Sequence, residues 1–201
     1  MQFDFDQISP DVGYRLLTST IVPRPIAWVS TLGAGGVANA APYSFFNAMG
    51  HTPPCVALGL LRDAARGWKD TARNILETGE FVVNLVPERL AQAMSATSAG
   101  VGPEVSEFEL AGLEMAVSTH IAPPRIAAAP VAFECRAISS VVTGPMQTVV
   151  IGRVLAAHID DAMVLDAERG HIDSPALGLI ARMHGAGWYA RTTDLFQLER
   201  P

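Results

Sequence analysis

Residues 131–159 read VAFECRAISSVVTGPMQTVVIGRVLAAHI, and this stretch decides the class of fold. Two runs rich in strand-forming residues, 131–142 and 147–159, flank the turn dipeptide Gly144-Pro145. We therefore predict a hairpin of two long antiparallel strands. Because an isolated hairpin is only marginally stable in water, this one must pack into a larger sheet, and the sequence predicts a mainly β protein.

Shorter strands are predicted outside this hairpin. They cover residues 26–31, 55–61 and 81–86, and a glycine-rich turn at 33–36 returns the chain from the first of them. Many short strands with few helices are typical of a closed or half-closed antiparallel β-barrel with flanking helices. No repeat or Gly/Ser linker divides the chain, so residues 1–201 are expected to form a single domain.

Helices are predicted at residues 10–17, 71–78 and 88–96. Asp70 is expected to cap the second of these helices and Gly79 to end it, whereas Pro87 suits the first turn of the third. Residues 174–183 are predicted to form a short helix or a turn.

The composition indicates a large apolar core. Hydrophobic residues make up 49% of the chain and charged residues 17%, and the formal net charge is −6. Lysine and arginine are scattered singly, so nucleic-acid binding is not expected. Cys55 and Cys135 lie far apart in apolar surroundings and are expected to be reduced thiols. The acidic start of the chain and the lack of a run of about 20 apolar residues predict a cytoplasmic protein without membrane association.

Side chains that would carry out catalysis by themselves do not stand out. The five histidines show no metal-ligand spacing, and no Gly-x-Ser-x-Gly elbow presents a nucleophile. Neither a metal site nor a catalytic side chain is therefore predicted. A chain without its own acid, base or nucleophile can still be an enzyme when a cofactor carries the reaction.

Several motifs follow one another along the chain: RPIAWVST (24–31), NAAPYSFFN (39–47), KDTARNI (69–75), ETGEFVVN (77–84), IGRV (151–154) and ARMHGAGWYAR (181–191). In this order they resemble the flavin reductase-like family, whose members form an FMN-binding split barrel. The resemblance covers nearly the whole chain. It implies an antiparallel split β-barrel of Greek-key type that binds FMN.

The resemblance implies that the flavin ring and its ribityl chain bind along the first two motifs. The strand at 26–31 is expected to lie at a barrel edge, where its backbone N–H and C=O groups meet the polar edge of the ring. The residues expected to contact the cofactor there are Ala27, Trp28, Val29, Ser30, Thr31, Ser44, Phe45, Phe46 and Asn47. A packed core residue is the alternative interpretation for Trp28, Phe45 and Phe46, and a plain strand end is the alternative for Ser30 and Thr31.

The phosphate of FMN needs positive charge or the free N–H groups of a helix start. Lys69, Asp70 and Thr71 offer these at the second predicted helix, through the Lys69 ammonium, the Thr71 hydroxyl and the helix dipole. A carboxylate such as that of Asp70, in contrast, repels phosphate. Arg24 is a further candidate, for phosphate or for a subunit contact. His184 stands where many family members carry glycine, and it either approaches the flavin or nicotinamide or replaces glycine at a surface turn.

The implied activity is that of a flavin reductase, in which NAD(P)H delivers hydride to FMN and the reduced flavin serves a partner monooxygenase. This reaction needs two stacked rings and no protein acid or base. The resemblance also implies a homodimer. Two other classes stay open: an FMN-binding electron carrier with little NAD(P)H turnover, and a β-barrel binding module without flavin.

Overall fold

The computed structural model describes residues 1–63 and 67–199. Its helices are α1 (Pro10–Thr20), α2 (Asp70–Thr78), α3 (Ala91–Ala96) and α4 (Glu107–Leu110), with the 3-10 helices η1 (Glu88–Leu90) and η2 (Asp161–Met163). Its strands are β1 (Arg24–Pro25), β2 (Ala27–Leu32), β3 (Ala38–Tyr43), β4 (Phe46–His51), β5 (Pro54–Asp63), β6 (Gly67–Trp68), β7 (Glu80–Leu85), β8 (Met115–Ala116), β9 (Arg125–Ile126), β10 (Val131–Gly144), β11 (Gln147–Ile159), β12 (Val164–Asp166), β13 (His171–Ile172), β14 (Ile180–Arg182) and β15 (Tyr189–Arg191).

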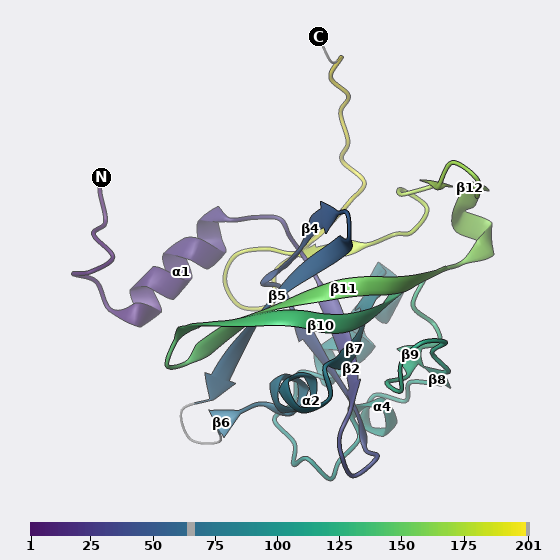
Figure 1. The fold of residues 1–201 in the computed structure, drawn as a ribbon. Coiled ribbons are helices and arrows are strands. Elements are labelled where there is room, and N and C mark those ends of the chain that lie inside the picture. The colour runs from purple at the N-terminus through teal and green to yellow at the C-terminus, as the bar shows by residue number, and fades with distance from the viewer. Residues whose placement is uncertain (64–66, 200–201) are drawn as a thin grey trace.

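An eight-stranded antiparallel sheet carries the fold (Figure 1). Its strands follow the order β3-β2-β7-β10-β11-β5-β4, and β6 pairs with β5 outside this row. The long hairpin predicted at residues 131–159 is confirmed as β10 and β11, which pair from Val131 opposite Ile159 to Gly144 opposite Gln147. The predicted fold class, mainly β and antiparallel with flanking helices, is confirmed.

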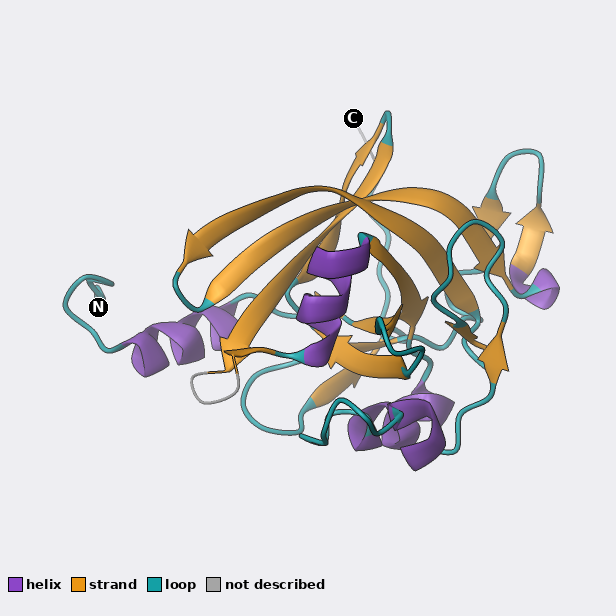
Figure 2. Ribbon diagram, turned by 60° about the horizontal axis from the view of Figure 1, so that its bottom comes forward, coloured by secondary structure: helices purple, strands orange, loops and turns teal. Residues whose placement is uncertain are grey.

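The sheet curls until its two edges meet. β3 and β4 lie at opposite ends of the row of strands, yet Tyr43 ends β3 and Phe46 begins β4. Two intervening residues span only about 10 Å even when fully extended, so the end of β3 must lie close to the start of β4. The Gly59 N–H of β5 donates to the Phe45 carbonyl at 2.7 Å, which extends the pairing of β4 with β5 into this crossing segment. The curled sheet arches over α2 (Figure 2).

Three hydrophobic clusters lie in the interior of the described part of the chain, and β2 contributes to the two larger ones. Neighbouring residues on a strand point to opposite faces, so Ala27 and Val29 enter one cluster and Trp28 enters the other. Ala72 of α2 packs into the first cluster with Ala27 and Val29. Gly79 ends α2 with a φ of 73°, as predicted, because glycine adopts this left-handed conformation without strain.

Several helical predictions need correction. Asp70 does not cap α2: Lys69 is the N-cap residue, and the Asp70 carboxylate contacts Arg73 instead. The helix predicted at 88–96 divides into η1 and α3, because Leu90 leaves the α-helical conformation with φ −103° and ψ 4°. For residues 174–183 the turn alternative is confirmed at 174–177, whereas 180–182 form β14, which pairs with β1 and β15. Helix α4 corresponds to none of the predicted helices.

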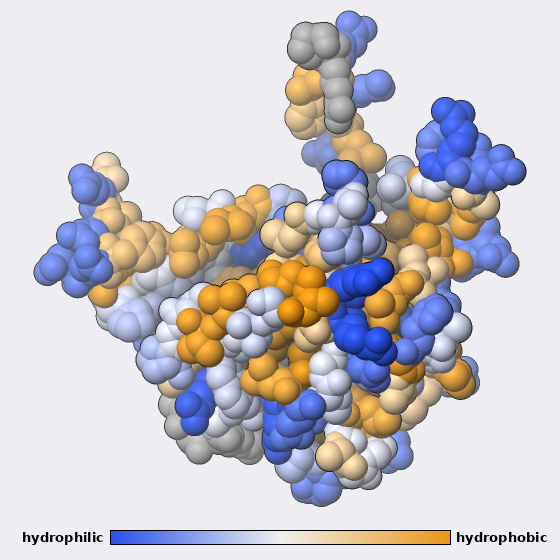
Figure 3. Space-filling view, in the orientation of Figure 1, coloured by the Kyte–Doolittle hydropathy of each residue, from blue (hydrophilic) through white to orange (hydrophobic). Residues whose placement is uncertain are grey.

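The surface carries an apolar patch on the long hairpin. Figure 3 shows apolar side chains gathered over β10 and β11. On β10, the exposed fractions of Ile138, Val141 and Val142 are 55%, 51% and 72%. Helix α1 stands beside the sheet, and the C-terminal segment extends away from it (Figure 1). No helix among the described residues is long and apolar enough to cross a membrane.

Closure of the sheet predicts a strong effect of a small substitution at Gly59. A Cβ atom at Gly59 would lie 2.9 Å from the Cβ of Phe45, which cannot retreat without moving its backbone. We expect Gly59→Ala to lower the free energy of unfolding by about 1–3 kcal/mol, the usual cost of overpacking. Urea denaturation measures it. Gly35→Ala is the matched control, because a Cβ there meets no atom within 4 Å. Equal denaturation midpoints for the two variants would contradict the proposed role of Gly59.

Candidate functional site

A cleft of about 620 Å³ opens between the edge strand β3, the start of α2 and the loop at 97–103. We call it the polar cleft, because charged, amide and hydroxyl side chains line much of it. β3 contributes Asn39, Ala41, Pro42 and Tyr43, the segment around the start of α2 contributes Asp63, Trp68, Lys69, Asp70, Thr71 and Arg73, and the remaining wall consists of residues 97–103 and Glu107. The cleft therefore combines a sheet edge with a helix start.

The start of α2 presents free hydrogen-bond donors at the wall of the polar cleft. The first turn of any helix leaves its backbone N–H groups without acceptors inside the helix. Lys69, the N-cap residue, forms no side-chain capping bond to these groups. The free N–H groups and the positive end of the helix dipole therefore favour an anion at this point.

Lys69 adds a full positive charge beside these donors. It is the only lysine of the 201-residue sequence, its side chain is exposed, and it forms no ion pair with any residue that the structure describes. The neighbouring Asp70 carboxylate is paired with Arg73, which offsets its repulsion of an anion. Helix start and ammonium together form a candidate phosphate subsite.

A buried polar network lies beneath the polar cleft. Asn39 Oδ1 accepts hydrogen bonds from Thr71 Oγ1 at 2.7 Å and from Thr31 Oγ1 at 3.3 Å. Asn39 Nδ2 donates to Glu107 Oε2 at 2.9 Å, and Asn74 Nδ2 donates to Thr31 Oγ1 at 2.9 Å. All five side chains are less than 10% exposed. The network ties α2 and α4 to the strands of the cleft floor.

Aromatic side chains form another part of the wall. Burial raises the pKa of the Tyr43 hydroxyl to about 12, against a smaller opposite effect of its hydrogen bond with Thr71, so it is a neutral donor at physiological pH. Glu107 lines the same cleft, and burial raises its pKa, although hydrogen bonds from its own backbone, Ala40 and Asn39 oppose the change. Trp68 is the second aromatic residue of the wall, with the Arg62 guanidinium 5.8 Å from its ring centroid. A flat ring and an anion both find complementary groups here.

The structure corrects the prediction that residues 26–31 lie at a sheet edge. β2 pairs with β3 on one side and with β7 on the other, so its backbone groups are engaged in the sheet. The side chains predicted as flavin contacts, Ala27, Trp28, Val29, Ser30 and Thr31, are all 0% exposed. Trp28 Nε1 donates to Thr97 Oγ1 at 2.9 Å inside the second hydrophobic cluster. In this structure β2 supports the cleft from beneath, and β3 is the strand at the edge.

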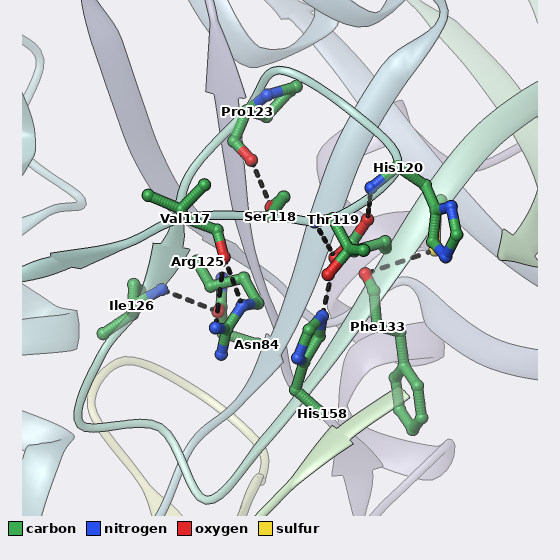
Figure 4. A network of polar contacts seen from close by, with 12 residues as sticks. Asn84, Val117, Ser118, Thr119, His120, Pro123, Arg125, Ile126, Phe133 and His158 are labelled. Carbon is green, nitrogen blue, oxygen red and sulfur yellow. Dashed lines mark hydrogen bonds and ion pairs between the residues drawn. The ribbon is translucent and has the colours of Figure 1, made fainter. Parts of the chain in front are cut away.

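Ser30 is covered by the loop that runs through residues 117–126, and Figure 4 shows how polar contacts hold this loop. Ser30 Oγ donates to the Pro124 carbonyl at 2.6 Å, and Asn84 Oδ1 accepts from the Ile126 N–H at 2.9 Å. The buried Glu134 carboxylate accepts the N–H groups of Thr119 and His120 at 2.6 and 2.7 Å. The loop thus closes this side of β2 to any ligand.

The Glu134 carboxylate stays charged although it is fully buried. Burial alone would raise its pKa, but hydrogen bonds from Thr119, His158 and His120 outweigh burial and hold the pKa of Glu134 below its ordinary value. His158 Nε2 lies 2.6 Å from Glu134 Oε1 and completes the set (Figure 4). Glu134 is therefore a structural anchor for the loop at 117–126.

Arg24 is likewise a structural residue. Its guanidinium donates to the carbonyls of Thr18, Ile21 and Met183 at 2.6, 2.8 and 3.0 Å, and to Ser44 Oγ at 3.3 Å. These bonds join the end of α1, the crossing between β3 and β4, and the segment after β14. With these donors engaged, Arg24 organises the chain around Ser44, and it lines a cavity shared with Phe45 instead of the cleft that contains Lys69.

Phe45, Phe46 and Asn47 lie at different cavities from Lys69, Asp70 and Thr71. All three line an apolar cavity of about 420 Å³. Phe46 and Asn47 also line a second apolar cavity of about 800 Å³. Ser44 precedes them on the crossing from the polar cleft. The structure therefore divides the predicted flavin contacts between a polar cleft and two apolar cavities that β3 and β4 connect.

His184 lies in an exposed turn, stacked on Trp188 with ring centroids 6.1 Å apart, and it lines none of these three cavities. No group of three or more His, Cys, Asp or Glu side chains able to hold a metal ion occurs among the residues that the structure describes.

Sequence reasoning missed Asn39, Tyr43 and Glu107. Asn39 and Tyr43 are four residues apart within one strand, so strand alternation was a usable signal that they share a face. Glu107 gave no such signal, because α4 is four residues long and its contact with Asn39 spans 68 positions of sequence.

Comparisons with known proteins identify relatives along the whole chain. Residues 18–173 match the family model described as "Flavin reductase like domain". An uncharacterized protein of Deinococcus radiodurans is 41% identical over 202 residues, which cover 98% of this chain and 88% of that protein.

Solved structures resemble this chain over its whole length as well. The nitrilotriacetate monooxygenase component B of Bacillus cereus superposes with a TM-score of 0.92 at 34% identity, covering 98% of each chain. The 2-nitrobenzoate 2-nitroreductase NbaA of Pseudomonas fluorescens superposes with a TM-score of 0.90 at 33% identity, covering 100% of this chain and 96% of that one. A Shewanella frigidimarina protein with a split barrel domain, 20% identical and with a TM-score of 0.82 over the full length of both chains, shows the same fold.

Proposed function

This chain belongs to the flavin reductase-like family, and we propose that it binds FMN and transfers hydride from NAD(P)H to the flavin. The observation that carries this proposal is the phosphate subsite of the polar cleft. There the only lysine of the chain stands beside the uncapped start of α2.

The groups of the polar cleft suit the phosphate end of FMN. Lys69 and the N–H groups around Thr71 would hold the dianionic phosphate, and the pairing of Asp70 with Arg73 limits repulsion. Ala41 and Tyr43 then lead along β3 to Ser44, where the ribityl chain would lie. In this proposal Ser44, through its hydroxyl, orients that chain.

The apolar cavities suit the ring end. Within a few residues of Tyr43 the chain reaches Phe45, Phe46 and Asn47 at these cavities. We assign them to the flavin ring and the nicotinamide, which need apolar walls that exclude water and a few polar groups that orient them. Bound FMN supplies the two-electron redox chemistry, which fits a chain without a predicted catalytic acid, base or nucleophile.

A partner monooxygenase is the proposed recipient of the reduced flavin. The likeness to a protein named as component B of a monooxygenase supports this assignment. Two alternatives remain. An FMN-binding electron carrier with little NAD(P)H turnover would use the same flavin site, whereas a β-barrel binding module would have no flavin site.

Titration and turnover separate these three possibilities. We expect the purified protein to quench FMN fluorescence at micromolar concentration and to oxidise NADH or NADPH in an FMN-dependent manner, followed at 340 nm. Binding without turnover would favour the electron carrier. Absence of FMN binding would refute the proposal and leave the binding module.

Lys69→Ala tests the phosphate subsite. We expect the Kd for FMN to rise at least about tenfold, as for loss of a charged hydrogen bond, while the Kd for riboflavin changes less than about twofold, because riboflavin has no phosphate. Arg169→Ala is the control, since it removes the same charge from an exposed turn far along the chain.

A second measurement uses the single lysine. Because Lys69 is the only lysine, an acetylating reagent with mass-spectrometric readout reports on it alone among the side-chain amines. FMN should protect Lys69 from modification and riboflavin should not. Equal losses of affinity for FMN and riboflavin in Lys69→Ala, or equal protection of Lys69 by the two ligands, would show that Lys69 does not contact the phosphate.

We also propose that the chain forms a homodimer, as the family resemblance implies. The apolar patch at Ile138, Val141 and Val142 and the 800 Å³ apolar cavity offer surface of the kind that subunits bury. Sedimentation velocity at micromolar concentration should give twice the mass of one chain. If this patch is buried between subunits, Val142→Asp should lower the measured mass toward that of one chain. A wild-type mass of one chain would refute the dimer.

A further inference from the structure

Glu107 fixes which way the Asn39 side-chain amide points. A carboxylate only accepts hydrogen bonds, so Glu107 Oε2 must face the NH₂ end of that amide, and it does so at 2.9 Å. The Ala40 N–H donates to the same oxygen at 3.3 Å and holds the carboxylate in place. A flipped amide would bring its oxygen against the carboxylate. Glu107 therefore directs Asn39 Oδ1 away from α4 and toward α2.

This orientation determines what the Thr71 hydroxyl does. Thr71 Oγ1 donates its single proton to Asn39 Oδ1 at 2.7 Å, which is the shortest bond of the network beneath the polar cleft. The hydroxyl therefore has no proton left for a ligand in the polar cleft. Its bond instead braces the first turn of α2 against β3, and that turn carries the free N–H groups next to Lys69.

We propose that Glu107 is a positioning residue for the phosphate subsite. It acts through Asn39 and Thr71 to hold the start of α2 where its N–H groups and Lys69 converge on one anion. The inference rests on the proposed function, because it assumes that this anion is the phosphate of a flavin. It assigns Thr71 a role different from the one predicted by sequence: its hydroxyl supports the helix start, and its backbone N–H faces the ligand.

The relation of charges strengthens this assignment. Glu107 lines the polar cleft together with the acidic residues Asp63 and Asp70, and a bare carboxylate would repel phosphate there. It is only 4% exposed, and its Oε2 is committed to Asn39 and Ala40. Glu107 therefore accepts hydrogen bonds from the groups beneath the cleft and does not contact the ligand itself.

Glu107→Gln tests the inference while keeping the size of the side chain. Glutamine has one acceptor oxygen and no negative charge, so it holds the Asn39 NH₂ group and the Ala40 N–H more weakly than the carboxylate does. We expect the Kd for FMN to rise about tenfold and the Kd for riboflavin to change less than about twofold. Glu109→Gln, at an exposed position of the same helix, is the matched control and should change neither Kd.

Thr71→Val provides a second variant should Glu107→Gln fold poorly. Valine keeps the shape of threonine but removes the hydroxyl, so the same selective loss of FMN affinity is expected. The two residues act through one chain of hydrogen bonds. The Kd for FMN of the double variant Glu107→Gln/Thr71→Val should therefore rise by much less than the product of the increases in the two single variants. A merely structural role would instead lower the affinity for both flavins alike.

The outcomes separate this inference from the function on which it rests. If Lys69→Ala weakens FMN selectively but Glu107→Gln and Thr71→Val leave the ratio of FMN to riboflavin affinity unchanged, the positioning role is overturned and the flavin site stands. Independent, multiplicative losses in the double variant would also overturn it. A wild-type protein that binds no FMN would overturn both.

Discussion

The two edges of the main sheet are joined by only two residues, and the rest of the architecture depends on this constraint. β3 and β4 lie at opposite ends of the row of strands, so the chain passes from one to the other only when the sheet is curled. Gly59 permits the close approach, because any larger residue would collide with Phe45. Curling exposes β3 beside the start of α2, and that juxtaposition creates the polar cleft.

The candidate site is built in two layers. The outer layer offers Lys69 and the free N–H groups of α2, and the inner layer consists of buried side chains that satisfy one another. Buried polar groups are costly unless they are hydrogen-bonded, and no buried side-chain polar atom among the described residues lacks a partner. The network around Asn39 therefore stabilises one arrangement of the cleft. In the proposed function the protein contributes binding and orientation, and FMN contributes the reaction.

Two solved relatives of nearly equal similarity carry different names, a monooxygenase component and a nitroreductase. One fold in this family thus serves more than one reaction. In the proposed function the polar cleft holds the phosphate of the cofactor. The apolar cavities at Phe46 and Asn47 hold the flavin ring and the nicotinamide in the same proposal.

The sequence by itself determined the long hairpin of β10 and β11, the helix after Lys69 with its glycine end, and the family, because these depend on local patterns and on motifs in a fixed order. It placed Lys69 and Thr71 at a helix start for the same reason. Only the tertiary structure decided that β2 is paired along both of its edges, that Asp70 pairs with Arg73 instead of capping, and that Glu107 meets Asn39 across 68 positions. Which neighbours a strand acquires, and therefore which face a ligand reaches, depends on contacts between distant segments that the curling of the sheet brings together.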